Sequence, residues 1–321
     1  MLIKIIQSEH RPDKQQSEMI IACSSSAIAR LCIHPTPFLH RARLTDSPHQ
    51  FLFPSSHRSV PPFLRDPPVL TAFRPPSAAL SDALLQDSGA TAAVLCGAYF
   101  LVLGFDKLTE AQILEQSLSR KLVHIASGLL FMASWPSFST SFEARYFAAL
   151  VPLINCMRLV ANGFSLVTDG SLVKSVTREG NPKELLRGPL YYVIILILSA
   201  TVFWRASPVG VVSVAMMCGG DGIADIIGRR YGFQKLPYNH HKSWLGSLSM
   251  FVCGSLISTG MLYYFTSLGC FSLDWSSTLQ KVVLVSLVAT FVESLPITKL
   301  LDDNLSVPLA SMVTALLVFG Y

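Results

Sequence analysis

Eight apolar stretches follow one another from residue 88 onward, and no other feature limits the fold as strongly. A helix needs about 20 predominantly apolar residues to cross a bilayer, with some tolerance. Several of the stretches are shorter, so seven crossings is an alternative to eight. Only 14% of the residues are charged, whereas ordinary soluble domains carry about 25%. We therefore predict an all-α, polytopic membrane domain over residues 87–321. The candidate spans are 88–105, 122–135, 144–163, 189–204, 208–228, 246–268, 278–296 and 305–321.

Residues 1–86 differ in composition and are excluded from the fold. They hold 11 of the 19 prolines and five of the eight histidines. Between Met19 and Leu80 there are six arginines, no lysine and two acidic residues. A Ser-rich, Arg-rich segment that is poor in acids is typical of an organelle transit peptide. We therefore predict that this segment is a disordered plastid transit peptide. A protein that starts at Met19 would fit this prediction better, and a plain disordered tail is the alternative.

Lysine and arginine gather on one side of the predicted membrane domain. If the spans alternate across a bilayer, the connections 106–121, 164–188, 229–245 and 297–304 share one face. This face holds twelve Lys and Arg residues, and the opposite face holds three. Such a bias orients the positive side inward, so we expect this face to meet the cytosol or, in a plastid, the stroma. The twelve are Lys107, Arg120, Lys121, Lys174, Arg178, Lys183, Arg187, Arg229, Arg230, Lys235, Lys242 and Lys299.

Five ionisable residues lie inside the predicted spans, all near the positive face. Charges within membrane helices are costly, and they usually face a cavity or one another. We therefore expect a polar site at this interface. Internal salt bridges, for example between Arg158 and Glu293, are the alternative. The five residues are His124, Arg158, Asp221, Asp225 and Glu293.

The stretch GGDGIADIIGRRYG, from Gly219 to Gly232, joins two acids to two arginines at the end of an apolar span. Asp221 and Asp225 are four residues apart, so they share one face of a helix, where their charges repel. A divalent cation relieves this repulsion, and Mg²⁺ prefers one or two carboxylates together with phosphate oxygens and water. We therefore predict a divalent cation on Asp221 and Asp225. A plain helix end with snorkelling arginines is the alternative.

Basic and small residues follow this acidic pair, and they suit a phosphate. Lys242 and Ser243 come just before a predicted span, and a helix N-terminus is a ready site for phosphate. Small residues let another backbone, or a phosphate, approach closely. We expect a polyphosphate to be held by Gly228, Arg229, Gly232, Lys242, Ser243 and Gly246.

The same residues fit a known family pattern. DxxAxxxGxxxG between Asp221 and Gly232, followed after eight residues by HKSxxG beginning at His241, resembles the CTP-binding motif of the polyprenol kinase family, which includes the dolichol kinases. The family pattern ends Lys-Lys-Thr-x-Glu-Gly. Here His241 replaces the first Lys, Ser243 the Thr and Leu245 the Glu. Any contact of that glutamate with nucleotide is therefore absent or moved.

Further stretches extend the resemblance over nearly all of residues 88–321, among them SRKLVHIASGLLF, ELLRGPLYY, LPYNHHKSWLGS and LDDNLSVPLA. Together they resemble the plant phytol kinases of the plastid. The resemblance implies transfer of the γ-phosphoryl group of CTP, or of UTP, to phytol in a chloroplast membrane, giving phytyl phosphate for tocopherol synthesis. It also implies Mg²⁺ or another divalent cation as the cofactor. A farnesol or geranylgeraniol kinase is the alternative.

The expected mechanism brings an alcohol from the bilayer to a nucleotide from the stroma. Phosphoryl transfer depends on in-line positioning and on neutralised phosphate charge. Asp221 or Asp225 is expected to accept the hydroxyl proton. Arg120, Lys121 and His124 form a second basic group, for which contact with anionic lipid is the alternative role. Glu293, Asp302 and Asp303 form a second acidic cluster, which binds a second metal, orders the basic loop or is simply solvated.

Other classes of protein fit less well. A transporter would place its ionisable groups near the bilayer midplane, whereas these lie at one face. A cytidylyltransferase acting on phosphatidate also uses CTP in a membrane, but its longer signature is missing from the sequence. A non-catalytic scaffold explains none of the clustering of acids and bases. The net charge of +5 is too small and dispersed to indicate nucleic acid as a partner.

Overall fold

The computed structural model describes residues 76–167, 169–177, 180–296 and 302–320. They belong to one compact unit, Thr71–Tyr321. Residues 1–75, with most of the predicted transit peptide, lie outside the described residues, as do Arg178 and Lys299. Helix α2 begins at Pro76, so residues 76–86, which were predicted to belong to the disordered segment, are helical. The boundary of the transit peptide itself stays a prediction.

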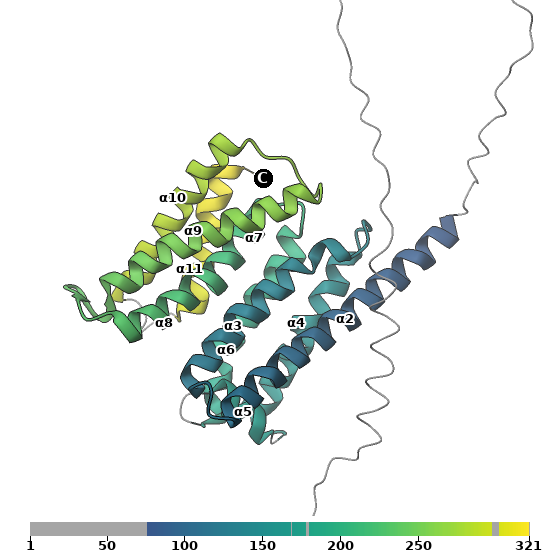
Figure 1. Ribbon diagram of the computed structural model, residues 1–321. Coiled ribbons are helices and arrows are strands. Elements are labelled where there is room, and N and C mark those ends of the chain that lie inside the picture. The colour runs from purple at the N-terminus through teal and green to yellow at the C-terminus, as the bar shows by residue number, and fades with distance from the viewer. Residues whose placement is uncertain (1–75, 168, 178–179, 297–301, 321) are drawn as a thin grey trace, which may run out of the picture. The chain divides into compact units, whose positions relative to one another are not determined.

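Helices make up the described unit apart from one small hairpin (Figure 1). Each of the eight predicted spans corresponds to a helical segment, which confirms the predicted all-α membrane fold. Six segments are long and apolar enough to cross a bilayer; α3, with two charged residues, and the shorter α11 are not among these six. The helices are α2 (Pro76–Glu110), α3 (Gln116–Ala133), η1 (Trp135–Ser137), α4 (Ala144–Gly163), α5 (Gly170–Val176), η2 (Pro182–Leu186), α6 (Gly188–Leu198), η3 (Ser199–Phe203), α7 (Pro208–Ala215), η4 (Met216–Asp221), α8 (Gly222–Tyr231), α9 (Trp244–Ser267), α10 (Trp275–Ser294) and α11 (Asp303–Phe319).

Short polar residues begin several of these helices. The side chain of Ser207 accepts a hydrogen bond from the amide of Val209, and Pro208 occupies the first turn of α7. Asp274 and Asp302 cap α10 and α11 in the same way. Because the first amides of a helix have no partner within the helix, such caps stabilise the start by about 1 kcal/mol.

The helices form two groups within the unit. In Figure 1, α2, α3, α4 and α6 lie together, and α7, α9, α10 and α11 lie together beside them. Helix α3 packs against α8 and η4, and α6 packs against α11, so these contacts join the groups. The segment η4 is a π-helix whose first three side chains, Met216, Met217 and Cys218, are fully buried. Such π-helical turns often mark functional sites.

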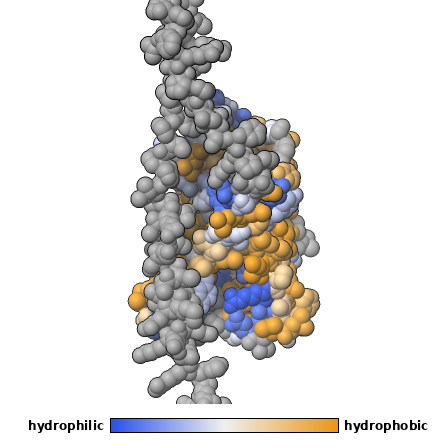
Figure 2. All heavy atoms as spheres, turned by 90° about the vertical axis from the view of Figure 1, so that its right-hand side faces the viewer, coloured by the Kyte–Doolittle hydropathy of each residue, from blue (hydrophilic) through white to orange (hydrophobic). Residues whose placement is uncertain are grey.

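Apolar side chains also cover much of the outer surface. Figure 2 shows one face that is largely apolar, with hydrophilic patches among the apolar side chains. Leu317, Phe291 and Leu256 are examples of large apolar residues that are more than 60% exposed. An exposed apolar surface of this extent is costly in water, and it suits a bilayer.

One short hairpin interrupts the helical pattern between α8 and α9. It consists of β1 (Lys235–Leu236) and β2 (Asn239–Ser243), which pair antiparallel. The side-chain amide of Asn239 donates to the carbonyl of Ser294 at 3.0 Å, and the Tyr238 hydroxyl contacts the Ser294 hydroxyl at 3.0 Å. The hairpin is therefore fixed to the C-terminal end of α10, a feature that the apolar pattern of the sequence did not indicate.

Candidate active site

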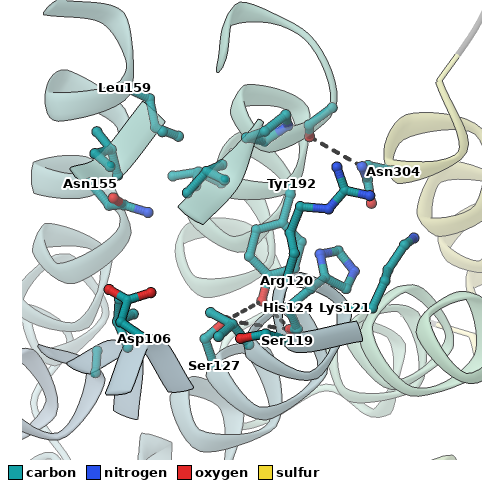
Figure 3. Close-up of a pocket in the computed structure, with 18 of the residues that line it drawn as sticks. Asp106, Ser119, Arg120, Lys121, His124, Ser127, Asn155, Leu159, Tyr192 and Asn304 are labelled. Carbon is teal, nitrogen blue, oxygen red and sulfur yellow. Dashed lines mark hydrogen bonds between the residues drawn. The ribbon is translucent and has the colours of Figure 1, made fainter. Parts of the chain in front are cut away.

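A cavity of about 1850 Å³ lies mainly among α2, α3, α4 and α6 and extends to α8, the hairpin and the start of α11. Its charged residues come from the end of α2, from α3, α4, η4, α8, the hairpin, the start of α11 and the segment before α6. Its other walls are largely apolar. Figure 3 shows Arg120, Lys121 and His124 projecting from α3 toward it. The predicted site residues that line this cavity are Arg120, Lys121, His124, Arg158, Asp221, Asp225, Lys242, Asp302 and Asp303.

Asp221 and Asp225 face the cavity together with Lys121. Asp221 ends the π-helix η4, and Asp225 lies in the first turn of α8. The Lys121 ammonium lies 3.2 Å from Asp225 Oδ2 and 3.8 Å from Asp221 Oδ2. Arg229 Nε lies 2.7 Å from the other oxygen of Asp225. Both acids thus line the cavity, and both have cationic partners within the protein.

Lys242 forms a second ion-pair centre on the same cavity. Its ammonium contacts the Glu293 carboxylate and lies 2.8 Å from Asp303 Oδ2. Burial by itself lowers the pKa of Lys242, but three carboxylates, led by that of Asp221, outweigh it and raise the pKa above its ordinary value. Lys242 therefore stays charged, and it brings one positive charge to a largely buried position.

Glu293 lies behind Lys242 rather than in the cavity wall. The residue is 3% exposed and does not line the cavity. It also accepts a weak hydrogen bond from the Ser247 hydroxyl at 3.4 Å. Of the three roles expected for the second acidic cluster, this geometry favours ordering of the basic segment, because Glu293 and Asp303 hold Lys242 between them.

Asp302 and Asn304 connect α11 to α6. Asp302 caps α11 through the amide of Asn304 at 3.0 Å, and the Asn304 side chain donates to the Gly188 carbonyl at 3.2 Å. These contacts fix the position of Asp303 between them. The expectation of a simply solvated loop is wrong for this segment, because all three side chains are partly buried and have structural contacts.

His124 is held against Tyr192 beside the acids. The two rings are in contact at an interplanar angle of 41°, with centroids 4.2 Å apart. The Tyr192 hydroxyl donates to the His124 carbonyl at 2.9 Å and lies 3.1 Å from the Ser127 hydroxyl. His124 Nε2 is 3.4 Å from the Met217 carbonyl. This network sets α3 against α6 and the π-helix, so it positions the neighbouring Lys121.

Arg158 pairs with Asp169, not with Glu293. Its guanidinium lies 2.5 Å from Asp169 Oδ2, and Asp169 in turn caps the start of α5. The example of a bridge from Arg158 to Glu293 is therefore wrong, although other internal ion pairs are present, because Lys121 pairs with Asp221 and Asp225 and Lys242 pairs with Glu293. Arg158 is half exposed and lines the cavity from α4.

The motif glycines and Ser243 pack helices rather than line the cavity. A Cβ added at Gly232 would lie 2.2 Å from Ser243 Oγ, and one added at Gly246 would lie 3.2 Å from the Cα of Gly228. The Ser243 hydroxyl caps α9 by accepting from the Gly246 amide at 3.1 Å. The small residues therefore let the backbones of α8 and α9 approach each other closely. A phosphate contact at these residues, or at Arg229, stays a prediction.

The acids offer an incomplete set of metal ligands. Within the described ranges, no group of three or more His, Cys, Asp or Glu side chains could hold a metal ion. Asp225 Oδ2 is buried and lacks a hydrogen bond, although Lys121 lies near it. Two carboxylates fit Mg²⁺ when phosphate oxygens and water complete the shell. The residues present therefore fit a cation that arrives with a nucleotide.

Several lining residues escaped sequence reasoning. Tyr192, Ser127 and Asn155 all face the cavity. The side-chain amide of Asn155, within an apolar span, could have indicated a cavity-facing residue, because such polar side chains seldom face lipid. Tyr192 carried no comparable signal, since tyrosine is common in membrane helices near their ends.

Comparison with known proteins identifies similar chains in plants. The chain is 64% identical over 262 residues to a probable phytol kinase 1, chloroplastic, of Glycine max, covering 82% of this chain and 86% of that protein. It is 61% identical over 245 residues to phytol kinase 1, chloroplastic, of Arabidopsis thaliana, covering 76% and 81%. A probable phytol kinase 1 of Oryza sativa subsp. japonica is 59% identical over 245 residues, covering 76% and 78%. No family model matches the chain, and no solved structure matches it.

Proposed function

The chain belongs to the family of the plant phytol kinases, and from this premise we propose that it is a membrane-embedded kinase that phosphorylates phytol with CTP as donor. One observation carries the proposal: Asp221, Asp225, Lys121 and Lys242 are among the residues at the charged end of a cavity whose other walls are largely apolar. The charged end suits a nucleoside triphosphate, and the apolar part suits a long alcohol. Donor and acceptor would then meet at one membrane boundary.

Asp221 and Asp225 are the proposed metal ligands. Their shared helix face and their position on the cavity support this role. A bound Mg²⁺ supplies positive charge to the phosphate oxygens and orients them. CTP, with UTP as the alternative donor, rests on the resemblance of the pattern beginning at Asp221 to the CTP-binding motif of the polyprenol kinases.

Lys121 and Lys242 are the proposed phosphate contacts from the protein. Lys121 approaches the acids from α3, and Lys242 approaches from the hairpin. Because carboxylates already fix each ammonium in place, neither charge must be reorganised when a phosphate arrives, and preorganised charge is the main source of catalysis in such transfers. Arg120 and Arg158 add positive charge around the same cavity.

The proposed reaction is a direct phosphoryl transfer. The alcohol oxygen forms a bond to the γ-phosphorus, the bond from that phosphorus to its bridging oxygen breaks, and CDP leaves. The hydroxyl proton passes to a carboxylate. Both oxygens of Asp225 have a cation within 3.2 Å, whereas Lys121 is 3.8 Å from Asp221. We therefore assign the proton acceptor to Asp221, which has fewer cations in direct contact.

We place the protein in a chloroplast membrane. The relatives in soybean, Arabidopsis and rice are named chloroplastic, and the described residues include six helices fit to span a bilayer. Residues 1–86 are the proposed transit segment. Import of the full chain into isolated chloroplasts, followed by carbonate extraction, tests both points: the protein should be shortened at its N-terminus and should stay in the membrane fraction.

A labelled-nucleotide assay tests the activity. Membranes that contain the full chain receive phytol, Mg²⁺ and CTP labelled on either the α- or the γ-phosphate. We expect γ-label, and no α-label, in the lipid product. Asp221→Asn and Asp225→Asn should each lower the rate by at least 100-fold, since each removes charge from the transfer site. Asp274→Asn is the matched control, because Asp274 caps α10 away from the cavity and asparagine caps equally well.

Other outcomes would overturn the proposal. Release of pyrophosphate, with α-label in the lipid, would identify a cytidylyltransferase instead. Full activity in both aspartate variants would remove the metal assignment. Uptake of phytol into liposomes without nucleotide, together with no labelled product, would favour a transporter.

A further inference from the structure

The cavity has an apolar arm that no step of phosphoryl transfer uses. Beyond the charged residues it continues between α2, α3, α4 and α6. Side chains from all four helices face it, and most are aliphatic or aromatic, with Ser127 and Asn155 as polar exceptions. Those that matter here are Val94, Ala98, Val102, Phe131, Val151 and Leu196.

Contacts between α2 and α3 set the depth of this arm. The Ser119 hydroxyl lies 3.4 Å from the Phe105 carbonyl, and a Cβ added at Gly97 would lie 3.6 Å from Leu130. The two helices therefore run antiparallel. Val102 lies within a turn of Phe105, near the charged end. Val94 lies eight residues before Val102 on α2, which places it about 12 Å deeper along the helix axis.

The arm and the charged end form one continuous space. Lys121 lies on the same helix as Phe131, ten residues and about 15 Å away along the axis. A molecule that fills the arm therefore ends beside Asp221 and Asp225. Its polar end must be small, because the charged end already has to hold phosphates. A long unbranched or branched alcohol meets this requirement, whereas a phospholipid with a large headgroup does not.

We propose that this arm binds the isoprenoid tail of the acceptor alcohol and that the residues along α2 measure its length. The proposal rests on the kinase activity proposed above. Short alcohols occupy only the part of the arm near Val102. Long alcohols reach Val94, where Val94, Phe131 and Leu196 form the deep end. The arm thus selects the substrate chain length, and the charged end selects the phosphate donor.

A series of bulky substitutions at successive depths tests this inference. Val94→Phe, Ala98→Leu and Val102→Phe are assayed in the full chain with geraniol, farnesol, geranylgeraniol and phytol, which span a range of chain lengths. Val94→Phe should lower kcat/KM about tenfold for the longest alcohols and leave geraniol unchanged. Ala98→Leu should shift the limit toward farnesol, and Val102→Phe should lower kcat/KM for every alcohol. Ala93→Phe is the control, because Ala93 is exposed on the same helix and does not line the cavity.

The readouts separate failure of the inference from failure of the activity. If the wild type phosphorylates alcohols and Val94→Phe lowers all rates equally, or acts no differently from Ala93→Phe, the arm does not measure chain length. A second measurement needs no turnover: an isoprenoid alcohol with a photoreactive group at its tail end should label peptides from α2 and α3, and Val94→Phe should reduce that labelling. Labelling elsewhere would overturn the inference even if no kinase activity were found. Ala98→Leu is the milder change that keeps the test valid if Val94→Phe fails to fold.

Discussion

Lys242 Nζ lies 2.8 Å from Asp303 Oδ2, and this contact joins the hairpin to the first turn of α11. The two residues are 61 positions apart in the chain. Glu293 contacts the same ammonium from α10. Three separate elements therefore fix one positive charge at the cavity, and the first two predictions concern this arrangement.

Lys242→Met should lower kcat/KM for the nucleotide by about 100-fold or more, because loss of one preorganised donor to a transition-state charge has an effect of that size. Initial rates at varied CTP and saturating phytol measure it. Lys235→Met is the control, since Lys235 is exposed on the same hairpin. Equal kinetics in the two variants would remove Lys242 from the phosphate site.

Glu293→Gln should leave the alcohol KM unchanged and raise the nucleotide KM, because it loosens Lys242 without touching the cavity wall. The variant should also lose about 2 kcal/mol of stability, the usual worth of a hydrogen bond to a charged group. Thermal unfolding in detergent and rates at varied substrate give both values. Glu143→Gln, an exposed change at the start of α4, provides the baseline. A changed alcohol KM would contradict the positioning role.

Lys121→Met should strengthen the apparent affinity for Mg²⁺ but lower kcat. The Lys121 ammonium lies 3.2 Å from Asp225 and competes with a cation for that carboxylate. Without it, the Mg²⁺ concentration needed for half-maximal rate should fall, while kcat falls because a phosphate contact is lost. Rates at varied Mg²⁺ and constant free CTP measure both. Lys107→Met, exposed near the end of α2, should change neither; a higher Mg²⁺ requirement in Lys121→Met would argue against Asp225 as a ligand.

Gly232→Ala should destabilise the protein, whereas Gly260→Ala should not. The added methyl group at Gly232 would meet Ser243 Oγ at 2.2 Å and the Gly228 carbonyl at 2.3 Å, so the C-terminal end of α8 would have to shift away from Ser243 and from its own preceding turn. At Gly260 there is nothing within 4 Å, and alanine favours a helix more than glycine does. Melting temperatures in detergent compare the two. Normal stability with lost activity in Gly232→Ala would instead support a phosphate contact at this glycine.

Sequence patterns were sufficient for the architecture and for part of the site. Apolar stretches predicted the helical spans, because a bilayer demands long apolar helices whatever their neighbours. The spacing of Asp221 and Asp225 predicted their shared face, because helical periodicity is local.

Only the tertiary structure decided which distant groups meet. Lys121 and Asp225 are 104 positions apart, and Lys242 and Glu293 are 51 apart; no local period relates such residues. Packing also decided that Gly232 admits the Ser243 side chain, that Arg158 takes Asp169 as its partner, and that an apolar arm opens beside the acids. Sequence alone thus determined which stretches of the chain form apolar helices. The fit of side chains between helices, which depends on the whole packed arrangement, determined which charges share a cavity and how deep that cavity runs.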